Sequence, residues 1–141
     1  MAAVKDYKTV NGGFGNQKSI VKVVYDFSKD AGATGALDLL VASGDMVITS
    51  FHAKVLTTCT SGGSATIDVG VSGGDTDILL DGFAVASMTA GALIMPTIVE
   101  GTPNVMPMPL KLASGGKIIQ TIGVAAFTAG KVEYVFEVMK F

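Results

Sequence analysis

The sequence predicts an all-β fold, a two-sheet antiparallel β-sandwich of jelly-roll type with about eight strands and an extended N-terminal arm. Three observations support this prediction. Several segments alternate apolar and polar residues, as half-buried strands do. Glycine-containing turns separate these segments at intervals of roughly 8–15 residues. No segment combines strand and helix signals in a βαβ order, which disfavours a parallel α/β sheet.

The elements follow in order along the chain. Residues 1–19 are polar, glycine-bearing and without period, so we expect an N-terminal arm there, followed by one sandwich domain over 20–141. A short helical turn is expected near 83–88, because the alternation breaks there. The predicted strands cover 20–27, 36–41, 46–60, 64–71, part of 91–101, 110–113, 117–127 and 131–141. Turns are expected at 28–35, 42–45, 61–63, 72–74, 114–116 and 128–130.

The composition narrows the classes of partner. Hydrophobic residues make up 49% of the chain and charged residues only 16%, which suggests that part of the surface is buried against another molecule. Lysine supplies every basic side chain and the net charge is −2, so nucleic-acid binding is not expected. The longest uncharged run, 82–99, is broken by Gly91 and Pro96, so no membrane span is expected. Cys59 is the single cysteine, which fits a reducing compartment.

Three aspartates, Asp75, Asp77 and Asp81, form the one candidate for a metal site. Clustered carboxylates on a loop can bind calcium, but their spacing lacks the third ligand and the terminal glutamate of an EF-hand. The simpler interpretation is that they close the turn by hydrogen bonding to nearby amides, and we expect no bound metal or cofactor.

No catalytic site is expected. By alternation His52 lies on the same face as Ser50 and Lys54, which we expect to be turned to solvent or to an interface, and the sequence places no nucleophile or orienting group beside it. Asp68, Glu133 and Glu137 could suggest a pair of glycosidase carboxylates, but they fall on the polar sides of strands, where charges are ordinary. The glycine-rich stretches 12–15 and 114–119 lack the full phosphate-loop patterns, so both are interpreted as arm or hairpin signals.

An interface between subunits is the alternative use of the surplus apolar residues. The segment 117–127 is apolar on both faces, with Ile118, Ile122 and Val124 on one face and Ile119 and Ala125 on the other. It is either a central strand covered on both sides or part of a subunit contact. The interface candidates are Tyr7, Phe14, Met106, Met108, Ile119 and Phe141.

The chain resembles the capsid decoration, or cement, proteins of tailed bacteriophages. The resemblance covers residues 20–141 and rests on the opening "VKVVYDFSKDAG", the hairpin "TSGGSATIDVGV" and the closing "TAGKVEYVFEVMKF". It differs at Ala31, where the pattern often has glycine. These motifs are strands and turns, so no catalytic residue is transferred.

The resemblance implies a non-enzymatic β-sandwich, commonly a homotrimer, assembled in the host cytoplasm and bound to the outside of the virion, where it clamps neighbouring major capsid subunits. Deleting residues 1–15 is then expected to spare the fold and weaken attachment. The alternative is a virion-associated module, a head fibre or tail component, that binds glycans at the host surface. It predicts an aromatic groove and calcium at the three aspartates.

Overall fold

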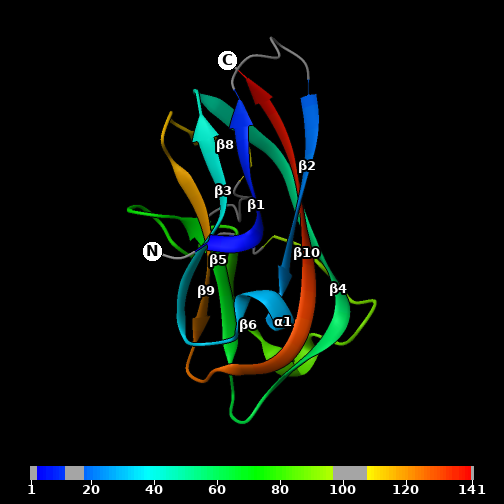
Figure 1. Ribbon diagram of the computed structural model, residues 1–141. Helices are drawn as coiled ribbons and strands as arrows, with labels where there is room; N and C mark the ends of the chain where they lie inside the picture. The colour runs from blue at the N-terminus through cyan, green and yellow to red at the C-terminus, as the bar shows by residue number, and fades with distance from the viewer. Residues whose placement is uncertain (1–2, 12–17, 97–107, 141) are drawn as a thin grey trace, which may run out of the picture.

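The protein is a sandwich of two mostly antiparallel β-sheets, which the computed structural model describes over residues 3–11, 18–96 and 108–140 (Figure 1). The strands are β1 Ala3–Asn11, β2 Lys18–Asp26, β3 Gly35–Ser43, β4 Met46–Ser61, β5 Thr66–Val71, β6 Leu80–Ala84, β7 Leu93–Ile94, β8 Leu110–Leu112, β9 Lys117–Gly123 and β10 Phe127–Lys140. Two short helices, α1 Phe27–Asp30 and η1 Val85–Ser87, interrupt them. The predicted all-β sandwich is therefore confirmed, while its assignment to the jelly-roll type stays a prediction.

One sheet has the strand order β1-β3-β9-β5-β6, and we call it sheet A. The other, sheet B, has the order β2-β10-β4-β7, with β8 also pairing to β4. All pairs are antiparallel except β1 with β3. Both sheets therefore have a central strand, β9 or β10, whose two neighbours come earlier in the chain.

The core lies between the sheets and is built by the alternation seen in the sequence. In β10 the inward residues Val132, Tyr134, Phe136 and Val138 are all fully buried. Phe51 of β4 packs on two of these rings, 6.2 Å from Tyr134 and 5.2 Å from Phe136 between centroids. Burying each such side chain contributes roughly 1.5–3 kcal/mol, so this aromatic layer is a main source of cohesion between the strands of sheet B.

The beginning of the chain departs from the expected arm. Residues 3–11 form β1, which pairs in parallel with β3 from Ala3↔Asp38 to Asn11↔Ser43. Val4 is 1% exposed and belongs to the core, whereas residues 5–9 are exposed. Because this segment contributes a core side chain, deleting residues 1–15 would remove an edge strand, and we no longer expect that truncation to spare the fold.

The turn before β10 lies earlier than predicted. The predicted turn at 128–130 is part of β10, and the chain reverses instead at 124–126. Phe127 accounts for this difference, because its side chain is buried against Tyr25 at a centroid distance of 6.2 Å. The residue is therefore the first of β10, and the turn precedes it. Gly130 serves close packing instead, since a Cβ there would lie 2.4 Å from the Cys59 Sγ.

Candidate interaction surfaces

The three loop aspartates are exposed on the segment between β5 and β6 and at the start of β6. Asp75 Oδ1 accepts a hydrogen bond from the Asp77 backbone N–H at 3.3 Å, which is the turn chemistry expected for this loop. The Asp75 side chain also hydrogen-bonds to the Asp77 carboxyl, and this contact, with Asp81 nearby, raises the pKa of Asp77 to about 6. Over the described ranges, no group of three histidine, cysteine or acidic side chains is placed to hold a metal ion.

The carboxylates considered for glycoside hydrolysis lie in different sheets. Asp68 is on β5 of sheet A, where its Oδ1 accepts the Gly82 backbone N–H at 2.5 Å. Glu133 and Glu137 are on β10 of sheet B. Glu137 accepts from the Thr49 hydroxyl at 2.7 Å and pairs with Lys18 at 3.4 Å, and these two contacts lower its pKa. Asp68 and Glu137 each have a hydrogen-bond partner within their own sheet.

His52 and Cys59 both lie on β4 but differ in burial. His52 is half-buried on β4, in register with Val135, and faces away from the core. Cys59 is buried at 4% exposure, and this burial raises the pKa of its thiol to about 11. A thiol with a raised pKa is a poor nucleophile at neutral pH, so Cys59 acts as a packing residue.

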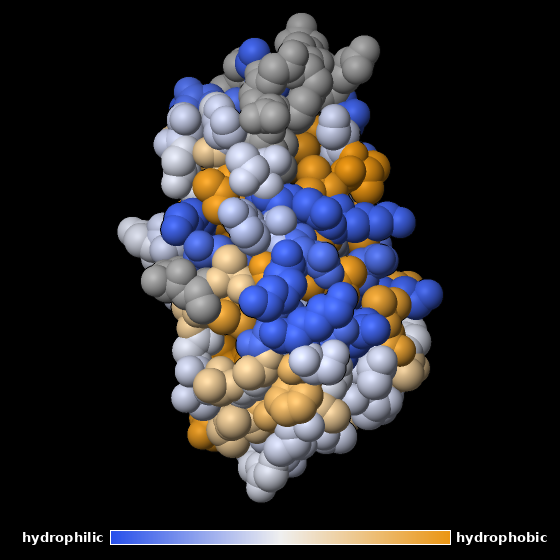
Figure 2. All heavy atoms as spheres, viewed as in Figure 1, coloured by the Kyte–Doolittle hydropathy of each residue, from blue (hydrophilic) through white to orange (hydrophobic). Residues whose placement is uncertain are grey.

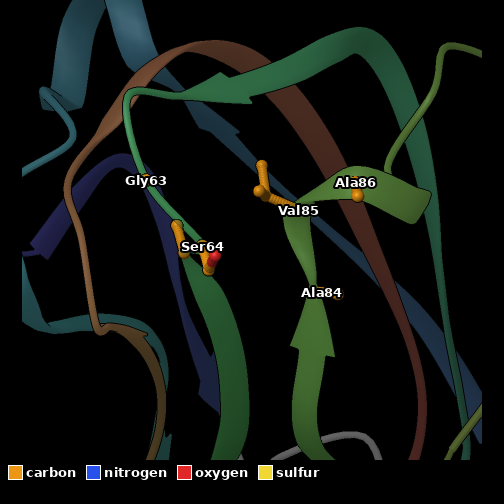
Figure 3. Close-up of a pocket in the computed structure, with 6 residues that line it drawn as sticks. Gly63, Ser64, Ala84, Val85 and Ala86 are labelled. Carbon is orange, nitrogen blue, oxygen red and sulfur yellow. The ribbon is translucent and has the colours of Figure 1, made fainter.

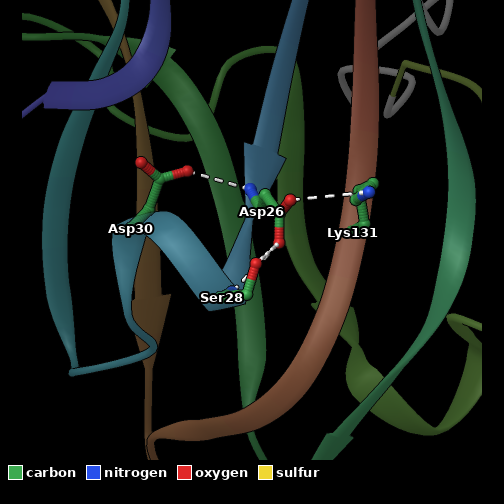
Figure 4. A network of polar contacts seen from close by, with 4 residues as sticks. All are labelled: Asp26, Ser28, Asp30 and Lys131. Carbon is green, nitrogen blue, oxygen red and sulfur yellow. Dashed lines mark hydrogen bonds and ion pairs between the residues drawn. The ribbon is translucent and has the colours of Figure 1, made fainter.

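A polar network joins the adjoining edges of the two sheets (Figure 4). Asp26 ends β2 and caps α1, accepting from the Ser28 N–H at 3.0 Å and from the Ser28 hydroxyl at 2.7 Å. These bonds, aided by Lys131 at 3.5 Å, lower the pKa of Asp26. The Asp30 carboxylate accepts from the Asp26 N–H at 2.9 Å and, with its other oxygen, from the Lys5 N–H of β1 at 2.6 Å. Asp30 thereby ties β1 to β2.

The predicted interface residues have different positions. Tyr7 lies on β1 with 46% of its surface exposed, so it is available to a partner. Met108 is half-buried against the core, and Ile119 is only 4% exposed, so both contribute mainly to the fold of the isolated chain. Phe14, Met106 and Phe141 lie outside the described residues.

Sequence reasoning missed most of the large apolar side chains that are exposed. Ile20 on β2 is 58% exposed, Leu56 on β4 is 40%, and Leu93 and Met95 around β7 are 67% and 63%. Val124 is 79% exposed, because β9 ends at Gly123 and the valine lies on the turn. The apolar pattern predicted a strand over the whole of 117–127 and did not show that β9 ends at Gly123. The glycine itself was the only indication in the sequence that the strand could end there.

A small hollow opens where the turn after β4 meets η1 (Figure 3). It has a volume of about 230 Å³. Its lining consists of small or aliphatic residues, Gly63, Ser64, Ala65, Ala84, Val85 and Ala86. A hollow of this kind suits one aliphatic side chain better than a polar ligand, because its lining carries no charged group.

No family model and no curated protein matches this sequence. The fold, however, is similar to that of chains in three solved bacteriophage capsid structures. The likeness to the acidic stable capsid structure of Helicobacter pylori bacteriophage KHP30 has a TM-score of 0.58 at 13% identity, covering 88% of this chain and 89% of that chain. The likeness to a chain of the cyanophage Pam1 capsid asymmetric unit has a TM-score of 0.57 at 13% identity, covering 92% of this chain and 89% of that chain.

For the capsid of Ralstonia phage GP4 the TM-score is 0.59 at 17% identity, covering 100% of this chain and 91% of that chain. Since almost the whole of each chain is matched, the likeness defines a complete fold and not a shared fragment. The class that results is an all-β sandwich of the kind found in phage capsid structures. Within the described residues, no helix is long and apolar enough to cross a membrane.

Proposed function

We propose that this chain is a structural protein of a bacteriophage virion, without enzymatic activity. The observation that supports the proposal most is the likeness of the fold, over nearly the full length of both chains, to chains from three phage capsids. The sequence resemblance to decoration proteins points in the same direction. Among the described residues, the acidic, histidine and cysteine side chains form no group of three that could hold a metal ion.

Within that role, we propose that the protein binds the outside of the capsid as a homotrimer and stabilises contacts between major capsid subunits. The exposed apolar side chains support an adhesive surface, because large aliphatic groups exposed in the free chain gain free energy when a partner covers them. A shell that carries many copies would add up modest individual contacts.

The test uses capsids of the phage that encodes this chain, prepared without it, and purified protein added back. We expect saturable binding to the outer surface, visible by cryo-electron microscopy, and a higher temperature of capsid disruption at saturation. A heat-unfolded sample of the same protein is the control for nonspecific adsorption. If shells cannot form without the chain, it is a component of the shell wall and the decoration role is wrong. Binding to host-surface glycans but not to shells would favour the alternative module.

A further inference from the structure

Uncharged segments gather at one end of the part of the molecule that the structure describes. Three uncharged stretches, 55–67, 82–96 and 118–130, come together there although they are far apart in the sequence. Val85 N donates to Ala65 O at 3.0 Å, and Cys59 N donates to Met88 O at 2.9 Å. Thr60 also joins the third stretch, since its Oγ1 lies 2.8 Å from the Oγ1 of Thr128.

We define the uncharged end as residues 56–66, 84–92 and 121–130. Figure 2 shows the consequence on one face, where strongly hydrophilic side chains gather in a band across the middle and the lower end is pale or orange. Chance does not easily produce this in a soluble domain, because charged side chains are usually spread over the whole surface. A surface without charge is well suited to be covered by protein.

Val124 protrudes from this end on a strained turn. Its φ is 70°, and Ala125 N donates to Gly123 O at 2.8 Å, so Val124 is the middle residue of a γ-turn of the rare positive-φ class. A β-branched residue is unfavourable in this region of φ. With 79% of its surface exposed, the side chain gains little inside its own chain. Strain at an exposed apolar residue points to a use outside the chain.

The hollow described above lies beside this turn. Gly63, one of its lining residues, packs so closely on the turn that a Cβ there would lie 2.9 Å from the Ala125 Cβ. A protruding aliphatic side chain and an aliphatic hollow are therefore neighbours on the same uncharged end. Every copy of the chain therefore carries both an aliphatic knob, the Val124 side chain, and a hollow that could receive the knob of another copy.

We propose that the uncharged end is a self-association surface, in which Val124 of one copy enters the Gly63–Ala86 hollow of a second copy. A second copy is the favoured occupant, because the protruding valine and a hollow that suits one aliphatic side chain lie on the same uncharged end of this chain. The Val124 knob and the hollow are different patches of the surface. Each copy can therefore insert its knob into one neighbour and receive the knob of another neighbour in its hollow. The inference rests on the homo-oligomer in the proposed function and names the surface that would form it.

The contact is small compared with the roughly 1,600 Å² of a typical stable interface, so association of the free protein should depend on concentration. Sedimentation velocity over a wide concentration range measures this directly. Val124→Asn removes the knob and relieves the turn, since asparagine tolerates positive φ. Ala86→Lys fills the hollow. Each change should weaken self-association by roughly tenfold or more, as expected for a central contact residue.

The matched control is Ile20→Asn, which makes a similar change at an exposed side chain on β2, away from the uncharged end. It should alter the association constant by less than about twofold. Circular dichroism confirms that all three variants are folded. Mixing the Val124→Asn and Ala86→Lys variants provides a second test, because the first keeps its hollow and the second keeps its knob. The mixture should form one-to-one complexes that neither variant forms alone.

A wild-type chain that stays monomeric throughout, or variants that associate like wild type, would overturn the inference. So would variants that fail to complement each other in the mixture. Capsid binding is measured separately. If Val124→Asn loses capsid binding while the wild type is monomeric, the knob serves the capsid and not a second copy. If self-association follows the proposal but capsids are not bound, the proposed function fails and the surface assignment stands.

Discussion

Gln120 and Tyr134 show how a single polar pair is accommodated in an apolar core. Tyr134 donates its hydroxyl to Gln120 Oε1 at 2.5 Å, and both residues are fully buried. The Gln120 Nε2 has no hydrogen-bond partner among the described residues, so the amide is only half satisfied. A buried polar group without a partner costs roughly 1–3 kcal/mol, and the pair is therefore sensitive to the loss of either member.

We predict that Tyr134→Phe and Gln120→Met each lower the free energy of unfolding by about 1–3 kcal/mol, because each leaves the other polar group buried and alone. The double variant should lose clearly less than the sum of the two, since it removes both polar groups together and the unpaired Nε2 with them. Urea denaturation of the four proteins measures this coupling. Strictly additive losses would show that the hydrogen bond contributes nothing.

At the scale of the element, β10 depends on a close crossing with β4. The pairing of these strands shifts register around Ala129 and Lys131, and Gly130 between them has a φ of 138°. A side chain at Gly130 would meet Cys59 at its Sγ, Cα and Cβ, all within 2.9 Å. The glycine is required both for its backbone conformation and for the space that Cys59 occupies.

We predict that Gly130→Ala destabilises the protein by about 2–4 kcal/mol, through steric overlap added to the cost of positive φ. Gly35→Ala is the matched control, because Gly35 has a φ of 126° and no atom within 4 Å of its hypothetical Cβ. It should cost only about 1–2 kcal/mol. Thermal unfolding of both variants separates the two contributions. Equal losses would mean that the contact with Cys59 is absorbed without cost.

The same elements show what the sequence could and could not predict. The alternation of apolar and polar residues predicted strands at 20–27, 64–71 and 131–141, and β2, β5 and β10 overlap these ranges. The alternation did not predict two strand boundaries. β10 begins earlier than expected, at Phe127, whose ring packs on Tyr25, and β9 ends earlier than expected, at Gly123. β1 was missed because residues 5–9 are exposed on both faces and leave no alternation to detect. The knob at Val124 and the hollow beside it depend on these boundaries and could not be anticipated.

For the whole molecule, the burial of tyrosine and cysteine side chains limits the stability of the fold at high pH. Desolvation holds the pKa of Tyr25 and Tyr134 well above the ordinary value of 10.0 and raises that of Cys59 from 9.0 to about 11. A raised folded-state pKa means that stability is fully present below the unfolded pKa and is lost as pH rises through the folded one. In the window above about pH 9–10 the unfolded chain releases protons that the folded chain retains.

We therefore predict that the free energy of unfolding falls as pH rises above about 10, with up to roughly 1.4 kcal/mol per pH unit for each group that ionises only on unfolding. Urea titrations between pH 8 and pH 11 measure the slope. Tyr25→Phe removes one such group and should make the slope shallower, whatever it does to stability at pH 8. A free energy that stays constant over this range would contradict the assignment of these side chains to a dry core.

The strand order has a consequence for how the protein is made. β9 and β10 are the central strands of their sheets, and both come after all of their neighbours in the chain. While a ribosome synthesises residues 1–116, β2 and β4 have no strand between them, and neither do β3 and β5. Neither sheet can close until β9 and β10 emerge, so the nascent chain stays open and aggregation-prone while residues 1–116 are made. Folding should be a late, cooperative and comparatively slow event, in which chaperones have a long time to act.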